Sequence, residues 1–164
     1  MKPVFKFFLR LAHCTSGSVL VEMTLIVPVA VALMAGVVDF SMALANQATA
    51  GKSVRGAARY LASLPAVAIC PSSGTGWGVT NAQNLAVYGN IAGTGNPLIS
   101  GWIASNVHVT YTAGCTNSPP ESFNITVTAN FSYSPIIITS LVPGSAGAFT
   151  MSATDEETSL AWFE

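Results

Sequence analysis

The feature that most constrains this chain is an apolar run of sixteen residues, Met23 to Val38, without a charged side chain. Glu22 precedes the run and Asp39 follows it. In a helix, the distance between these two carboxylates is roughly 26 Å, close to the hydrocarbon thickness of a bilayer. The run therefore predicts one transmembrane helix over residues 18–40, with Asp39 and Phe40 at a membrane interface.

Three other interpretations of this run stay open. It could be a buried core helix, although such a helix would be shorter and would not follow a basic leader. It could be a signal peptide cut after the A-x-A triplet at Ala43–Ala45, although a leader of 45 residues exceeds the usual 15–30 or so. It could also be a single-pass anchor that is never processed.

Charge is scarce and unevenly placed in this chain. Charged residues make up 8 % of the 164 residues, against about 25 % in an average protein. At 51 % hydrophobic residues and a formal net charge of −1, the composition excludes a disordered chain and argues against nucleic acid as a partner. All basic residues lie in the first 59 positions, in two groups: Lys2, Lys6 and Arg10, then Lys52, Arg55 and Arg59.

The start of the chain carries a second pattern. A basic leader over residues 1–17 ends in Gly17, and Ser18, the apolar run and a glutamate five positions past the glycine, Glu22, follow. This arrangement resembles the processing site of type IV prepilins. The resemblance implies cleavage between Gly17 and Ser18 by a prepilin peptidase. The new α-amine of Ser18 would then be neutralised by Glu22 of a neighbouring helix, which gives Glu22 a role in assembly.

The resemblance extends beyond the membrane segment. Pro28 inside the run, the Asp39-Phe40 step and the segment from Gly51 to Tyr60 resemble the TadE-like pseudopilin family, over about residues 17–62. The family implies a minor pilin or pseudopilin of the tight-adherence (Flp-type) pilus, a type IV pilus-related system of cell adhesion. Its expected partners are the prepilin peptidase, other pilins and pseudopilins, inner-membrane pilus assembly proteins and the lipid bilayer. Met23 stands where major pilins often carry Tyr, which favours a minor pilin.

The helix is expected to continue past the membrane over residues 41–64, as far as the Leu64-Pro65 step. Pro28 should kink it, because proline frees the carbonyl four residues earlier. In the continuation, a basic stripe of Lys52, Arg55 and Arg59 lies on one helix face. The stripe is either a solvated face or a surface for acidic groups, namely lipid headgroups or side chains such as Glu156. The opposite face is apolar, with Val54, Ala57, Ala58 and Leu61.

Cysteine usage suggests the compartment. Removal of the leader takes away Cys14 and leaves Cys70 and Cys115, an even number. We expect these two to form a disulfide, which places the C-terminal part outside the cytoplasm. The alternative is two free, buried thiols. The predicted localisation is the bacterial inner membrane, single-pass, with the head in the periplasm or in an extracellular fibre.

Residues 65–164 are expected to form an extracytoplasmic globular head of pilin-like type. Trp77 and Trp102 are the expected core anchors, and residues 84–92 the expected helix. Period-two alternation predicts strands over 107–112, 125–131 and 148–153. The predicted fold class is therefore α+β: a long N-terminal transmembrane helix that continues into a small antiparallel sheet.

No set of residues predicts catalysis. His108 lies among the polar residues of a predicted strand that alternates apolar and polar residues. The Cys/His spacing of a metal site is missing from the sequence. The Asp155-Glu156-Glu157 run is interpreted as a solvated tail. We therefore expect neither an enzyme nor a cofactor or metal. The alternative function is a single-pass envelope protein with a ligand-binding extracytoplasmic head.

Overall fold

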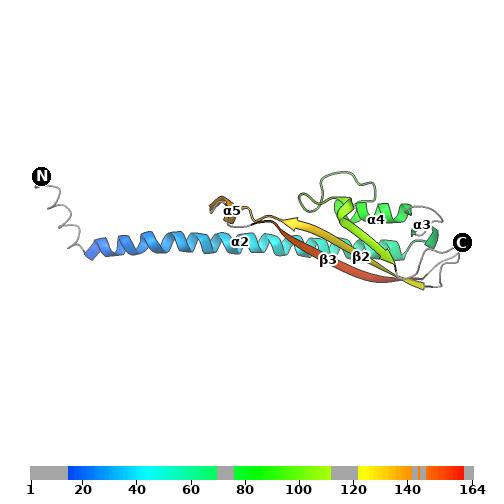
Figure 1. Ribbon diagram of the computed structural model, residues 1–164, viewed down its shortest axis with the longest axis horizontal. Coiled ribbons are helices and arrows are strands. Elements are labelled where there is room, and N and C mark those ends of the chain that lie inside the picture. The colour runs from blue at the N-terminus through cyan, green and yellow to red at the C-terminus, as the bar shows by residue number, and fades with distance from the viewer. Residues whose placement is uncertain (1–14, 70–75, 112–121, 142–143, 145–146, 161–164) are drawn as a thin grey trace, which may run out of the picture. The chain divides into compact units, whose positions relative to one another are not determined.

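The structure is a computed structural model that describes residues 15–69, 76–111, 122–141, 144 and 147–160. These fall into two compact units. One unit comprises Met1–Ser41 and Pro135–Ala146, and the other comprises Met42–Ser134 and Gly147–Glu164. Figure 1 labels the helices and strands.

The first described element is one long helix, α2 (Thr15–Ala62), of 48 residues. It continues through Pro28. The helix ends at Ala62, two residues before the predicted end at Leu64: the amide of Ser63 donates to the Arg59 carbonyl and that of Leu64 to the Leu61 carbonyl, directly before Pro65. The expected helix and its continuation past residue 41 are confirmed.

Three strands form an antiparallel sheet in the order β1 (Val107–Tyr111), β2 (Ser122–Tyr133) and β3 (Phe149–Leu160). β2 pairs with both neighbours. The α+β class, with a long apolar N-terminal helix and a small antiparallel sheet, is confirmed.

The third strand is longer than predicted. The prediction stopped at Ala153, whereas β3 pairs along the whole of β2 and reaches Leu160. The interpretation of Asp155-Glu156-Glu157 as a solvated tail is therefore wrong, because all three residues lie inside the strand. Strand alternation turns Asp155 and Glu157 to one face and Glu156 to the other.

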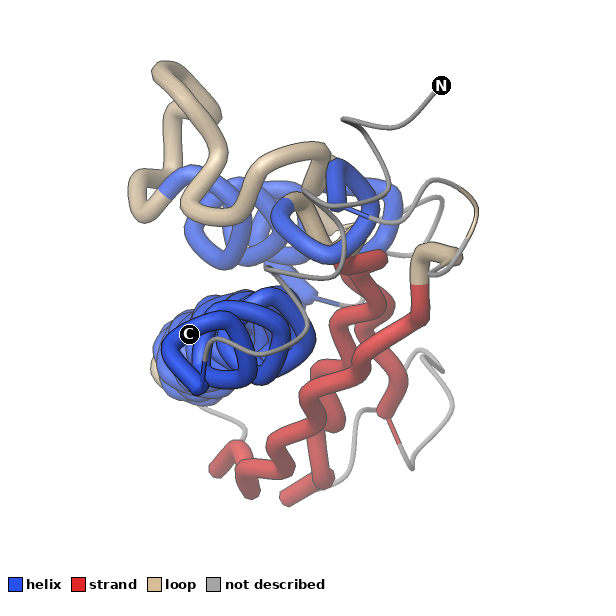
Figure 2. Tube along the Cα trace, turned by 90° about the vertical axis from the view of Figure 1, so that its left-hand side faces the viewer, coloured by secondary structure: helices blue, strands red, loops and turns tan. Residues whose placement is uncertain are grey.

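The core of the second unit lies between the C-terminal half of α2 and the sheet (Figure 2). The helix contributes a fully buried stripe that includes Val54 and Leu61. β2 contributes alternate residues such as Ile125 and Val127, also fully buried. Complete burial of one such side chain stabilises the folded state by about 1.5–3 kcal/mol. The apolar contact between α2 and the sheet therefore holds the helix continuation in place.

Two short helices and a 3₁₀ turn complete this unit: α3 (Ala66–Ile69), α4 (Trp77–Tyr88) and η1 (Ala104–Asn106). The predicted helix over 84–92 is placed too late, because α4 ends where Gly89 adopts a φ of 72° and its amide bonds the Leu85 carbonyl. Trp102 is a core anchor as predicted, 1 % exposed and stacked obliquely on Phe131. The same prediction for Trp77 is wrong, since that side chain is 56 % exposed.

The connection between β2 and β3 contains a further helix, α5 (Ile137–Leu141). It belongs to the unit that holds the first part of α2. The sequence pattern predicts no element here.

Candidate assembly and membrane segment

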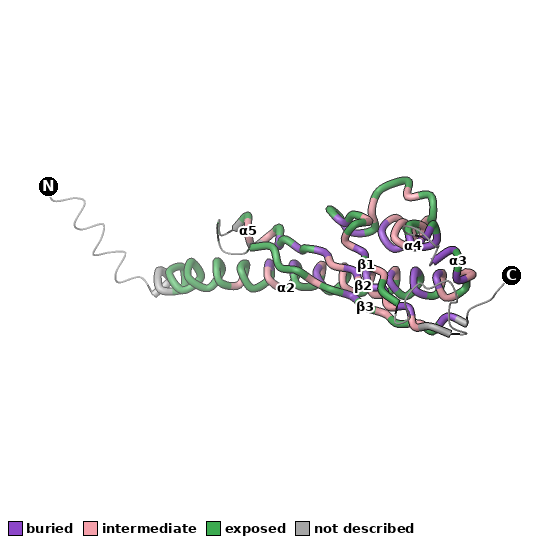
Figure 3. The backbone as a smooth tube through the Cα atoms, turned by 45° about the vertical axis from the view of Figure 1, so that its right-hand side comes forward, coloured by how far each residue is buried: buried purple, intermediate pink, exposed green. Residues whose placement is uncertain are grey.

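The first part of α2 presents apolar side chains to its surroundings. Figure 3 shows exposed residues along the N-terminal half of the helix, and buried ones recurring along its C-terminal half. Large exposed residues follow one another along this segment: Val19, Leu20, Val21, Met23, Leu25, Ile26, Val27, Val29, Val31, Leu33, Met34, Val37 and Val38. A helix that is apolar on every side belongs in a lipid or protein environment rather than in water.

By length and composition, α2 is a candidate membrane span over Val19–Ala62. These 44 residues would reach about 66 Å, roughly twice the hydrocarbon thickness. Only part of the helix can therefore lie within a bilayer. The exposed apolar part before Asp39 has the apolar composition of a segment that lies within a bilayer.

Glu22 lies within this exposed apolar part. Its side chain is exposed, and among the described residues none lies at ion-pair distance from it. A carboxylate in such a position costs about 2.5–3.5 kcal/mol at mid-bilayer and less near an interface. Within the described residues, the Glu22 carboxylate therefore faces the surroundings of the helix.

The predicted processing residues, Gly17 and Ser18, lie in the first turns of α2. The leader up to residue 14 lies outside the described residues, and so do Cys70 and Cys115 of the predicted disulfide. Pro28 lies within α2, and the kink expected there stays a prediction.

Asp39, predicted at a membrane interface, is only 3 % exposed. Its Oδ1 accepts the backbone N–H groups of Ile136 and Ile137, each at 3.2 Å, and its Oδ2 accepts that of Ile137 at 3.1 Å. Asp39 therefore satisfies amides at the start of α5 that no helical carbonyl can reach. Phe40, the next residue, is exposed. The sequence analysis missed this contact, which joins residues 97 and 98 positions apart.

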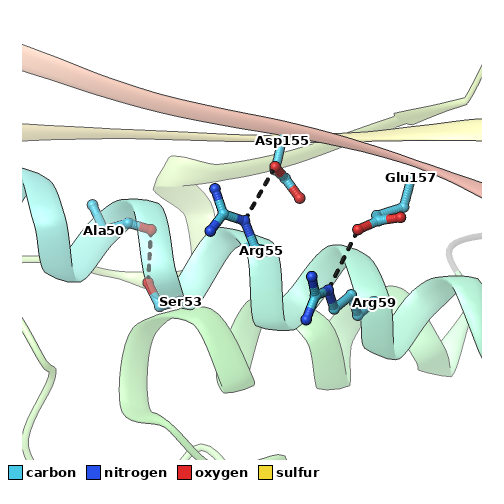
Figure 4. Close-up of polar contacts among 6 residues, drawn as sticks. All are labelled: Ala50, Ser53, Arg55, Arg59, Asp155 and Glu157. Carbon is cyan, nitrogen blue, oxygen red and sulfur yellow. Dashed lines mark hydrogen bonds and ion pairs between the residues drawn. The ribbon is translucent and has the colours of Figure 1, made fainter.

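Two residues of the predicted basic stripe have acidic neighbours on β3, as Figure 4 shows. Arg55 Nε lies 3.7 Å from Asp155 Oδ1, and Arg59 Nε lies 3.5 Å from Glu157 Oε1. The acidic side chain named as an example in the prediction, Glu156, lies on the opposite face of the strand. Both pairs are partly exposed, which limits what each contributes to stability.

The third residue of the stripe, Lys52, lines an open groove of about 310 Å³. The groove lies on the side of α2 toward the end of α4, where Leu85 and Leu98 form its apolar wall. Small residues, Gly56 and Gly89, leave the space open.

Comparison with known proteins adds one finding to this geometry. The family model described as TadE-like protein matches residues 17–59. The chain carries a TadE-like segment. This confirms the predicted resemblance, and the family suggests a tight-adherence pilus-related protein. No curated protein and no solved structure matches the chain.

The TadE-like segment coincides with most of α2. It begins at Gly17, includes Glu22, Pro28 and Asp39, and ends at Arg59, the last residue of the basic stripe. Its first part is the exposed apolar helix, and its second part carries buried apolar residues such as Val54, which pack in the core of the second unit. One continuous helix, α2, thus contains both the candidate membrane span and buried residues of the core.

Proposed function

We propose that the chain is a minor pilin or pseudopilin of a tight-adherence pilus, which acts through α2 rather than through catalysis. The observation that carries the proposal is the exposed apolar surface of α2 over residues 19–38, inside the TadE-like segment. Such a helix first holds the subunit in the bilayer. During assembly it then packs against the equivalent helices of other subunits.

Processing is part of this proposal. Cleavage between Gly17 and Ser18 by a prepilin peptidase would remove the basic leader and create a cationic α-amine on Ser18. Glu22 lies four residues later, about one helical turn along α2, with an exposed side chain. A carboxylate so placed can neutralise the amine of a neighbouring subunit, so that neither charge stays unpaired in apolar surroundings. The family match begins at Gly17, which supports this boundary.

The proposed location is the bacterial inner membrane, with a single span and the head in the periplasm or an extracellular fibre. Cys70 and Cys115 would form a disulfide there. The proposed partners are the prepilin peptidase, other pilins and pseudopilins, and inner-membrane pilus assembly proteins. No cofactor enters the proposal.

N-terminal sequencing of the chain, purified from cells with and without a prepilin peptidase, tests the proposed processing. We expect the sequence to start at Ser18 when the peptidase is present and at Met1 when it is absent. A start at Asn46 would instead identify a signal peptide. An intact Met1 in the presence of the peptidase would identify an unprocessed anchor, and either result would contradict the proposal.

A further inference from the structure

The first half of the connection that contains α5 is mostly apolar, whereas an ordinary surface turn is polar. Residues 135–141 read P-I-I-I-T-S-L, and no charged residue occurs between Glu121 and Asp155. Ile136 is 66 % exposed, and Ile137 is partly exposed. Short connections in water usually carry Gly, Asn, Asp and Ser, so this composition indicates a different environment.

Two hydroxyls of α5 and the amides at its start have acceptors within the protein. The Thr139 hydroxyl donates to the carbonyls of Pro135 and Ile136, and the Ser140 hydroxyl donates to that of Ile137 at 2.8 Å. The amides of Ile136 and Ile137 donate to Asp39. Because these hydroxyls and first amides already have acceptors within the protein, and Ile136 is exposed, this part of the segment can leave water with few hydrogen bonds to solvent lost.

Asp39 fixes the place of α5 along α2. Its carboxylate immediately follows the apolar run, and it reaches the first amides of α5 directly. Between residues 19 and 41, the buried residues of α2 are Ala35 and Asp39, one turn apart on the same face. Figure 1 shows α5 beside this part of the helix. The exposed Ile136, directly before α5, therefore lies next to the residue that ends the apolar run.

We propose that residues 135–141 are a second membrane-contacting element, which inserts the side chains of Ile136 and Ile137 into the boundary between headgroups and acyl chains. The occupant of this surface is thus the lipid bilayer. The buried Asp39 carboxylate lies at the interface with its charge satisfied by α5 rather than by water. This inference rests on the proposed membrane anchoring of α2, and it adds a contact that a single spanning helix does not have.

An environment-sensitive fluorescent amino acid, introduced by amber suppression into the full chain in phosphatidylcholine–phosphatidylglycerol nanodiscs, tests this proposal. Three matched exposed positions are compared: Ile136 in the connection, Leu33 in the apolar part of α2, and Ile91 in the second unit. Each labelled protein is titrated with nitroxide-bearing lipids and, separately, with aqueous iodide.

We expect nitroxide lipids to quench most of the emission at positions 33 and 136 and to leave position 91 unchanged, with iodide giving the reverse order. Iodide quenching at 136 equal to that at 91 would overturn the inference. Protection of 136 from both quenchers would also overturn it, by showing that protein covers the segment. Loss of lipid quenching at 33 would instead contradict the proposed anchoring itself.

A second measurement avoids any change at Ile136. In the unlabelled chain, a spin label carried by the lipids should broaden the methyl NMR signals of Ile136 and Ile137 and spare those of Ile91. Equal line widths at Ile136 and Ile91 would overturn the proposal independently of the fluorescent residue.

Discussion

Asp39 shows how one side chain can serve two elements. It terminates the apolar run of α2 and at the same time accepts the first amides of α5. A buried carboxylate without partners would be costly, and unpaired amides at a helix start would be costly as well. The hydrogen bonds between the carboxylate and the amides remove the cost of leaving either group unpaired. Asp39 therefore makes the position of α5 dependent on a single residue of α2.

Replacement of Asp39 should release α5. In Asp39→Ala, the amides of Ile136 and Ile137 lose their acceptor, at a cost of about 1–3 kcal/mol for a buried unsatisfied group. Hydrogen exchange at these two amides should then accelerate about tenfold or more. Asp39→Asn is the matched control, because its remaining carbonyl oxygen still accepts one donor and should retain part of the protection. Unchanged exchange in Asp39→Ala would contradict this role.

The two arginine–carboxylate pairs should differ in strength. The Asp155 side chain is less exposed than that of Glu157, and its Oδ2 is buried without a hydrogen-bond partner among the described residues. Arg59→Gln should therefore cost about 0.2–1 kcal/mol, as exposed pairs do. Arg55→Gln should cost more, because it leaves a more buried carboxylate uncompensated. Thermal unfolding of the full chain in micelles, followed by Trp102 fluorescence, measures both. Equal losses of stability in the two variants would contradict the expected difference between the two pairs.

At the scale of elements, local pattern sufficed for α2 and failed for α5. The apolar run and the 3.6-residue spacing of Val54, Ala57 and Leu61 are visible within a few turns of sequence. α5 has only five residues, and a run of isoleucines after a proline does not distinguish helix from strand. Its position depends on Asp39, almost a hundred residues earlier, which local pattern cannot include.

The same limit applies to the basic stripe. Its residues and their common face could be read from the sequence, but their partners depend on the register of β3 against β2. The prediction ended the strand at Ala153 and so left the acidic residues in a tail. Full pairing with β2 instead places Asp155 and Glu157 on the face toward Arg55 and Arg59.

Buried and exposed leucines of α2 should respond differently to the same substitution. Leu61 is fully buried in the seam with the sheet, whereas Leu44 is 53 % exposed on the same helix. Leu61→Ala should lower the free energy of unfolding of the head by about 2–5 kcal/mol. Leu44→Ala should change it by about 0.5 kcal/mol or less. Trp102 fluorescence in thermal unfolding reports both, and similar losses for the two variants would contradict the described core.

At the scale of the whole molecule, processing would change the charge balance. The full chain has a formal net charge of −1. Loss of residues 1–17 removes Lys2, Lys6 and Arg10, so that three basic residues face seven acidic ones, a formal charge of −4 before the new α-amine is counted. The processed protein would thus be acidic, with the Glu22 carboxylate directly before the apolar run.

Glu22→Ala separates insertion from assembly. Membrane insertion should be unchanged, because the substitution removes a charge from an apolar helix. Incorporation into pili should fall, because the Ser18 α-amine of a neighbouring subunit loses its counter-ion. Membrane fractionation and immunodetection in sheared pili measure the two steps. Thr24→Ala is the control, since it removes a neighbouring polar group without a charge. Normal assembly of the Glu22 variant would remove the proposed role.

The length of β3 has a consequence for many copies held close together. Among the described strands, β3 pairs with β2 alone, so it forms one margin of the sheet. The exposed backbone groups of such an edge strand can pair with a strand of another chain, which leads to aggregation. Here three consecutive acidic residues interrupt the margin, and Glu156 stays exposed. Heads crowded side by side would therefore repel one another along this strand, and contact between subunits would be left to their helices.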